Sequence, residues 1–153
     1  MEQYRDKIEE HAAAMERMGL TPVAARVFVY LLLSEEHQAT FEQMVTYFRV
    51  SKSAVSNALK MLESTKMVGS KTVGGQRKRY FYASLRSLFG EDYMTARMKQ
   101  FITLLDDIRI VRNTKDDFSQ ELSDVGTFYK MMLFEIPLIL ERWRRTVEMN
   151  RER

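Results

Sequence analysis

The segment 51–84 changes its periodicity halfway along, and this change limits what the chain can fold into. In the part 51–65, apolar residues recur at the spacing of one helix face: Val55, Leu59 and Leu62, helped by Ala54 and Ala58. In the part 67–84, β-branched and aromatic residues lie on both sides of Gly74-Gly75. This pair suits a two-residue hairpin turn because glycine accepts positive φ. The segment therefore predicts a helix followed by a β-hairpin.

Two helices are expected near the start of the chain. Apolar residues mark one helical face over 4–18, and Gly19 is expected to end that helix. Thr21 can cap the next helix, with Pro22 at its first position, where a missing N–H costs nothing. This second helix, "VAARVFVYLLLS", is apolar nearly all round. We therefore expect it to be the buried centre of a domain.

A short helix over 41–48 completes the pattern. Thr40 and Gln43 fit a capping box at its start, and Ser51 caps the next helix after a turn of three residues. Helix, short helix, turn, polar-faced helix and basic hairpin in this order predict a winged helix-turn-helix. The expected fold class is mainly α with a small β-hairpin wing, plus long N- and C-terminal dimerisation helices.

Two long amphipathic helices are expected after residue 84. Apolar residues repeat in two series, Met94, Met98, Phe101, Leu105 and Ile108, then Phe118, Leu122, Val125, Tyr129, Met132, Ile136, Ile139, Trp143 and Val147. Thr114 and Asp117 resemble a capping box between the two helices. Pro137 should kink or split the second helix, because its ring supplies no N–H and clashes one turn back.

We expect one main core and a two-fold dimer. A chain of 153 residues with 45% hydrophobic residues is long enough for one real core. The apolar stripes outside the winged domain exceed what that core can bury, and large exposed apolar surface is rare on monomers. The expected domains are an N-terminal dimerisation helix at 1–18, a winged helix-turn-helix domain at 19–84, and a C-terminal helical region for dimerisation and effector binding at 85–153.

Positive charge is concentrated in the middle of the chain. Residues 49–86 include nine lysines or arginines and one acid, Glu63, although the net charge of the whole chain is only +3. A basic middle between acidic flanks is expected where one face meets a polyanion such as double-stranded DNA. A solvated lysine surface is the alternative interpretation.

Polar residues on the outside of the 51–65 helix and on the hairpin are the candidate DNA contacts. Short hydroxyl and amide side chains can hydrogen-bond base edges and phosphates, and lysines can neutralise phosphates. The candidate residues are Thr40, Ser51, Lys52, Ser53, Ser56, Asn57, Lys60, Gln76, Arg77, Lys78 and Arg79. Ser51 has helix capping as a competing role. Arg77 and Lys78 have protection of the hairpin edge as theirs.

Catalytic chemistry and membrane insertion have no support in the sequence. The chain has no cysteine, which excludes a disulfide scaffold, a thiolate zinc site and a cysteine nucleophile. His11 and His37 are far apart, no catalytic groups converge, and we expect no enzymatic activity, cofactor or metal site. The longest apolar run, "VFVYLLL", is too short to span a bilayer, and the charged N-terminus is no secretory signal. We expect a cytoplasmic protein.

Beyond these patterns, "LTPVAARVFVYLLLSEEHQATFEQMVTYFRVSKSAVSNALKMLESTKMV" is similar to the DNA-binding domain of bacterial MarR-type regulators. The leading "ERMGLTPVAARVFVYLLLS" and the hairpin "VGGQRKRYFYA" resemble the GbsR branch, regulators of choline and glycine-betaine metabolism. The resemblance covers Met15 to Ala83 and implies a cytoplasmic homodimeric transcriptional regulator, a ligand-responsive repressor with its recognition helix at 51–65 and its wing at 71–80. The alternatives are a winged-helix adapter for an acidic protein, and an enzyme or small-molecule carrier built on the long helices.

An effector site is expected in the C-terminal part. Aromatic residues crowd this part, namely Phe101, Phe128, Tyr129, Phe134 and Trp143, and Glu135 and Glu141 add negative charge. Phe101, Phe128, Tyr129 and Trp143 could form a cage for a quaternary ammonium ion, which π faces attract. The GbsR resemblance implies choline or a relative as the ligand. The alternative is that aromatic residues at helical spacing form core and dimer interface.

Overall fold

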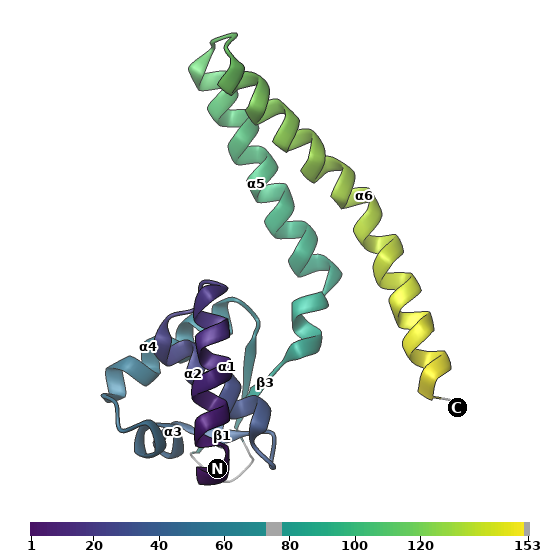
Figure 1. The fold of residues 1–153 in the computed structure, drawn as a ribbon. Helices are drawn as coiled ribbons and strands as arrows, with labels where there is room; N and C mark the ends of the chain where they lie inside the picture. Colours follow the sequence, from purple (N-terminus) through teal and green to yellow (C-terminus); the bar gives the residue numbers. More distant parts are fainter. Residues whose placement is uncertain (73–77, 152–153) are drawn as a thin grey trace. The chain divides into compact units, whose positions relative to one another are not determined.

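The computed structural model describes residues 1–72 and 78–151 and divides into two compact units, Met1–Leu88 and Phe89–Arg153 (Figure 1). The first unit contains a 3₁₀ turn η1 (Glu2–Tyr4), α1 (Arg5–Arg17), α2 (Pro22–Leu33), β1 (Ala39–Thr40), α3 (Phe41–Phe48), α4 (Lys52–Ser64), β2 (Val68–Thr72) and β3 (Arg79–Ala83). A second 3₁₀ turn, η2 (Leu85–Phe89), precedes α5 (Glu91–Arg112) and α6 (Asp117–Arg151) of the second unit. The predicted fold class, mainly α with a small β-hairpin, is confirmed.

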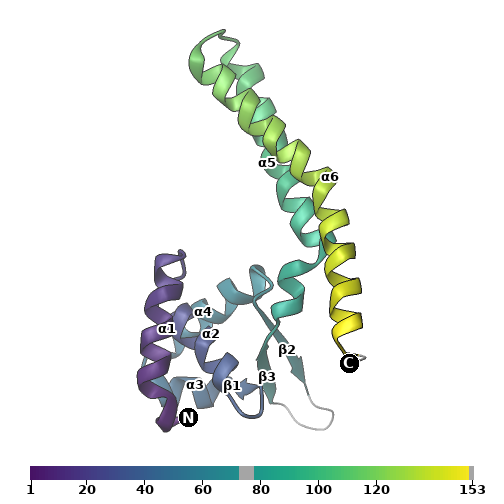
Figure 2. The same ribbon diagram turned by 45° about the vertical axis from the view of Figure 1, so that its right-hand side comes forward.

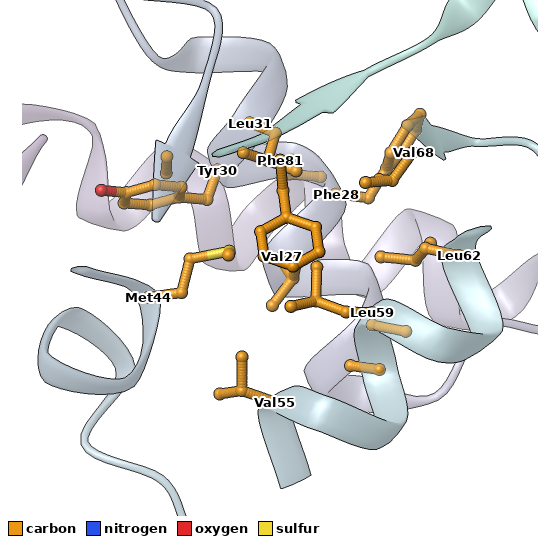
Figure 3. Close-up of a cluster of buried hydrophobic side chains, with 14 of the residues drawn as sticks. Val27, Phe28, Tyr30, Leu31, Met44, Val55, Leu59, Leu62, Val68 and Phe81 are labelled. Carbon is orange, nitrogen blue, oxygen red and sulfur yellow. The ribbon is translucent and has the colours of Figure 1, made fainter. Parts of the chain in front are cut away.

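Helix α2 is the centre of the first unit. Its residues from Ala24 to Leu31 are buried with the exception of Arg26, because the helix is apolar nearly all round. Helices α1 and α4 and strand β3 all pack on it. The ring of Phe81, from β3, lies in the middle of the buried cluster, close to Val27 and Leu59 (Figure 3). The buried centre predicted from the sequence is therefore confirmed.

Helix α1 belongs to the same unit as the winged domain. Its Ile8 and Ala12 are each 1% exposed, and Tyr4 and Met15 lie against the core. An ion pair of 2.8 Å between Glu9 and Arg26 adds a polar contact between α1 and α2. Part of the apolar stripe that the sequence assigned to a dimer is thus buried within the chain itself.

The small sheet has the strand order β1-β3-β2, and both pairs are antiparallel (Figure 2). The β2–β3 ladder runs from Val68 opposite Ala83 to Thr72 opposite Arg79, which confirms the hairpin. The proposed turn at Gly74-Gly75 lies outside the described residues. Strand β1 was not predicted, because two residues are too few to show an alternating pattern.

Capping side chains start the helices of the first unit. The Oγ1 of Thr40 accepts a hydrogen bond from the N–H of Gln43 at 3.3 Å, and the Oε1 of Gln43 accepts one from the N–H of Thr40 at 2.7 Å, so the predicted capping box is confirmed. Pro22 occupies the first turn of α2 as expected. Thr21 stands at the N-cap position, but its hydroxyl makes no capping hydrogen bond.

Helix α1 ends in a Schellman motif. Gly19 has φ +99°, its N–H donates to the carbonyl of Glu16 at 2.9 Å, and the N–H of Leu20 donates to the carbonyl of Met15 at 3.1 Å. The predicted stop at Gly19 is confirmed.

Helix α4 ends in the same motif with a lysine where glycine is usual. Lys66 has φ +60°, its N–H donates to the carbonyl of Glu63 at 3.1 Å, and the N–H of Met67 donates to the carbonyl of Leu62 at 2.9 Å. The reversal lets β2 begin at Val68, directly after α4. A left-handed backbone costs an L-residue roughly 1–2 kcal/mol, so α4 ends at the expense of some strain.

The second unit is a helical hairpin. Helices α5 and α6 pack on each other along a buried seam that contains Ile102, Leu105, Leu122, Ile136 and Leu140. Helix α6 continues through Pro137, so of the two outcomes expected there the split does not occur. The two long helices predicted from the apolar series are confirmed.

The cap of α6 differs from the predicted one. An Asp116 carboxylate oxygen accepts a hydrogen bond from the N–H of Ser119 at 2.8 Å, and this bond is the main reason that the pKa of Asp116 falls to about 2. The Oγ1 of Thr114 lies 3.2 Å from the Oγ of Ser119 instead of capping the backbone. The box assigned to Thr114 and Asp117 was wrong, because the cap is Asp116 and the helix begins at Asp117, two residues later than a box starting at Thr114 requires.

We predict that Lys66→Gly stabilises the first unit by about 0.5–1 kcal/mol. Relief of the left-handed conformation, worth roughly 1–2 kcal/mol, exceeds the extra backbone entropy of glycine, roughly 0.5–1 kcal/mol. Urea unfolding followed by circular dichroism measures the difference. The matched control is Lys66→Ala, which removes the same side chain but keeps the strain and should not be stabilised. Equal stability of both variants would contradict the prediction.

Candidate nucleic-acid interface

Helices α3 and α4 are joined by a tight turn. Arg49 ends α3 in the left-handed conformation, with φ +53°, and its N–H donates to the carbonyl of Val45 at 3.0 Å. Ser51 then starts α4, and its Oγ accepts a hydrogen bond from the N–H of Ala54 at 3.2 Å. The capping role of Ser51 is therefore confirmed. Its hydroxyl also lies 3.0 Å from that of Ser53, so the start of α4 presents two linked hydroxyls.

The two faces of α4 divide as the sequence predicts. Val55, Ala58, Leu59 and Leu62 are buried in the core. Lys52, Ser53, Asn57 and Lys60 are exposed, and Ser56 is half-buried.

Four of the polar side chains on the outer face of α4 have no partners within the described residues. The structure gives the side chains of Ser56 and Asn57 no hydrogen bond, and the ammonium groups of Lys52 and Lys60 no ion pair, in the part of the chain that it describes. Hydroxyl, amide and ammonium groups in this state are available to base edges and phosphates.

Thr40 does not share this surface. Its side chain lies in the capping box, and the residue is only 8% exposed, between β1 and α3. The structure therefore gives Thr40 a role in starting α3.

The wing residues fall into two groups. Gln76 and Arg77 lie outside the described residues. Lys78 is exposed just before β3. Arg79 begins β3, and its Nη2 donates to Glu63 of α4 at 2.6 Å and to the Oγ of Ser70 of β2 at 2.7 Å. The predicted basic cluster thus includes an arginine that is already bound by a carboxylate.

A groove of ≈ 360 Å³ lies between α4, the start of α3 and β3. Its walls include four of the predicted contact residues, Ser56, Lys60, Lys78 and Arg79, together with the acids Glu42 and Glu63. The helix and the hairpin therefore bring their candidate residues to one surface. Sequence reasoning missed Glu63, although its position as the sole acid within 49–86 was a signal.

The predicted aromatic cage is brought together only in part. The ring centroids of Phe101 and Tyr129 are 4.9 Å apart, and those of Phe128 and Tyr129 are 5.9 Å apart. Trp143 follows Tyr129 by fourteen residues in the same helix, which corresponds to about 21 Å along the axis. Phe134 is 79% exposed. One site cannot contain both Tyr129 and Trp143 of the same chain.

A hollow of ≈ 600 Å³ lies beside the aromatic pair, between α5 and α6. Phe101, Leu104 and Tyr129 form part of its wall. Its charged lining residue is Arg97, which donates to the hydroxyl of Tyr93 at 2.8 Å, and no carboxylate lines it among the described residues. Neither Glu135 nor Glu141 contributes to this lining.

Within residues 1–72 and 78–151, no three histidine, aspartate or glutamate side chains come together as metal ligands would. In the same residues, no helix has both the length and the apolar character required to cross a bilayer.

No protein-family model and no curated protein matches this chain. Among solved structures, it is similar to a crystal structure of a transcriptional regulator, with 21% identity over 94% of this chain and 99% of that one and a TM-score of 0.81. This likeness shows the winged helix fold. MepR, a transcription regulator of the Staphylococcus aureus multidrug efflux pump MepA, has 16% identity over 86% of this chain and 94% of its own, with a TM-score of 0.44. The adhesin competence repressor AdcR of Streptococcus pyogenes has 18% identity over 88% of this chain and 96% of its own, with a TM-score of 0.40.

We predict that choline at millimolar concentration changes neither the melting temperature of the protein nor the fluorescence of Trp143. Among the described residues, the cation would meet Arg97 in the hollow and no carboxylate, so repulsion offsets the attraction of the aromatic faces. Thermal shift and fluorescence titration measure the two quantities, with sodium chloride at equal ionic strength as control. A saturable shift with choline alone would restore the cage predicted from the sequence.

Proposed function

We propose that this protein is a cytoplasmic, homodimeric transcriptional repressor that binds double-stranded DNA and responds to a ligand. In this proposal α4 enters the major groove and the wing at 71–80 reaches an adjacent minor groove. The observation that carries the proposal is the outer face of α4, with its exposed Lys52, Ser53, Asn57 and Lys60, which packing does not use. Support also comes from the solved structure with the same fold, which is a transcriptional regulator.

The chemistry of this face favours DNA over an acidic protein partner. A partner recognised by charge alone needs the lysines but not the short polar side chains between them. Ser53, Ser56 and Asn57 can approach base edges closely, because their side chains are short. The repressor role and the ligand response rest on the resemblance to MarR-type regulators, and the α5–α6 hollow is the place proposed for the ligand.

The proposed dimer is supported by the apolar surface of the second unit. Helix α5 exposes Phe101, Leu104, Ile108 and Val111, at spacings of three, four and three residues. Helix α6 exposes a longer set, namely Phe118, Val125, Phe128, Met131, Phe134, Leu138, Ile139 and Trp143. Stripes of this kind are expected to pack on other helices, and a second copy of the chain offers the same stripes. Symmetric pairing would place two α4 helices about 34 Å apart on an inverted repeat.

We predict different defects for the α4 and wing variants in DNA binding. Asn57→Ala should reduce the preference for a selected site over a random duplex by about 1–3 kcal/mol, because it removes a base contact. Lys78→Ala should weaken both duplexes and lower the salt slope by about one unit, because it removes a phosphate contact. The site is first selected from a random-sequence library with the full chain, and binding is then measured at several salt concentrations.

Lys115→Ala is the matched control, because it removes the same charge from the exposed turn between α5 and α6. This variant should leave both the preference for the selected site and the salt slope close to those of the wild type. If the wild-type chain selected no sequence yet bound duplexes in a salt-sensitive way, specific recognition would be excluded and the adapter interpretation would gain support.

We predict that the protein is a dimer of twice the 18.1 kDa chain mass in light scattering. Phe134→Asp should raise the dimer dissociation constant at least about tenfold, because a carboxylate would replace an apolar side chain in the interface. Phe134 is 79% exposed, so the fold of the hairpin should survive the change. Ser64→Asp, which adds the same charge at an exposed position of the first unit, away from these stripes, is the control and should remain dimeric. A monomer at micromolar concentration would remove the dimer from the proposal.

A further inference from the structure

Glu63 joins three elements at the edge of the candidate DNA surface. Its Oε1 accepts hydrogen bonds from the Nη2 of Arg79 at 2.6 Å and from the Oγ of Ser70 at 2.8 Å. The same Nη2 donates to the Oγ of Ser70 at 2.7 Å. The three side chains belong to α4, β2 and β3, so each one contacts the other two across element boundaries.

The network lies at the base of the wing. Arg79 pairs with Thr72 in the last rung of the β2–β3 ladder that the structure describes. The guanidinium carbon of Arg79 lies 5.0 Å from the ring centroid of Phe81, and Phe81 is itself buried in the core at 5% exposure. The guanidinium is therefore held between a carboxylate of α4 and a ring of the core.

Part of the Arg79 guanidinium is left for another partner. Both hydrogen bonds of this side chain use Nη2, and within the described residues Nε and Nη1 have none. The Arg79 side chain is 55% exposed, whereas that of Glu63 is 26% exposed. An arginine fixed in this way can still offer a phosphate single N–H donors from Nε and from Nη1.

Neither folding stability nor charge alone accounts for the presence of an acid at position 63. An exposed ion pair contributes little to folding. A carboxylate beside a DNA-binding surface weakens binding by repelling phosphates, and Glu63 is the sole acid among nine lysines and arginines between residues 49 and 86. A role in geometry explains why an acid stands at this position.

We propose that Glu63 is a positioning residue for DNA recognition. It holds Arg79 and the base of the wing against α4, so that α4 and the wing meet the duplex at a fixed spacing. The sugar-phosphate strand between the two DNA grooves then lies along the groove lined by Ser56, Lys60, Lys78 and Arg79. This role rests on the proposed function, and it assigns Glu63 to sequence discrimination and not to affinity.

The test compares two carboxylates of the same groove. Glu63→Gln and Glu42→Gln each remove one negative charge, and Glu42 makes no hydrogen bond or ion pair with the wing within the described residues. We expect Glu42→Gln to tighten binding to the selected and random duplexes alike, which leaves their affinity ratio unchanged. Glu63→Gln should lower that ratio roughly two- to fivefold, the range set by loss of one exposed ion pair.

A second pair of variants separates position from charge. Glu63→Asp keeps the charge but is shorter by one methylene, and Arg79→Lys keeps the charge but loses the planar fork. Each should lower the affinity ratio as Glu63→Gln does. The double variant Glu63→Gln/Arg79→Lys should lower the ratio no further than either single variant, because both substitutions act through one contact. Melting temperatures of all variants verify that the chains compared are folded at the assay temperature.

The outcomes distinguish this role from the proposed function. Failure of the wild-type chain to select any site would overturn the proposed function itself. A wild-type chain that discriminates, with Glu63→Gln and Glu63→Asp both keeping the wild-type ratio, would leave the proposed function intact and overturn the positioning role. Additive losses in the double variant would also overturn it.

Discussion

The enclosure of α2 is the constraint on which the first unit depends. A helix that is apolar nearly all round has no face for water, so it folds only if other elements surround it. Helix α1 covers one side through Ile8, while α4 and β3 contribute Leu59 and Phe81 to the cluster around Val27. The same burial therefore fixes three elements at once. The orientation of α4, and with it the direction of its outer face, follows from the packing of α2.

The structure assigns separate tasks to residues that the sequence grouped together. Thr40 and Ser51 serve the backbone, since each accepts a hydrogen bond from an N–H in the first turn of a helix. Ser56 and Asn57 have no such task among the described residues. Arg79 stands between these two groups, because Glu63 holds one part of its guanidinium and leaves another part to solvent.

Periodic features of the fold were predictable from the sequence, and features that depend on tertiary distance were not. The helices and the β2–β3 hairpin follow from apolar spacing and from residues such as Gly19, Pro22 and Thr40. Strand β1 exists only because β3 lies beside it, so two residues could not reveal it. The predicted aromatic cage is not brought together as one site for a related reason, because Tyr129 and Trp143 are fourteen residues apart in the same helix.

The division of α4 into a buried face and an exposed polar face has a consequence for how such a chain diverges. Substitutions at Val55 or Leu59 disturb the core, and a change at Ser51 removes a cap, so these positions are restrained by folding. Ser56 and Asn57 carry no comparable restraint within the described residues. Under the proposed function, a duplicated copy could therefore acquire a new DNA target by single substitutions at those two positions. Its targets would then drift over generations while its fold stayed the same.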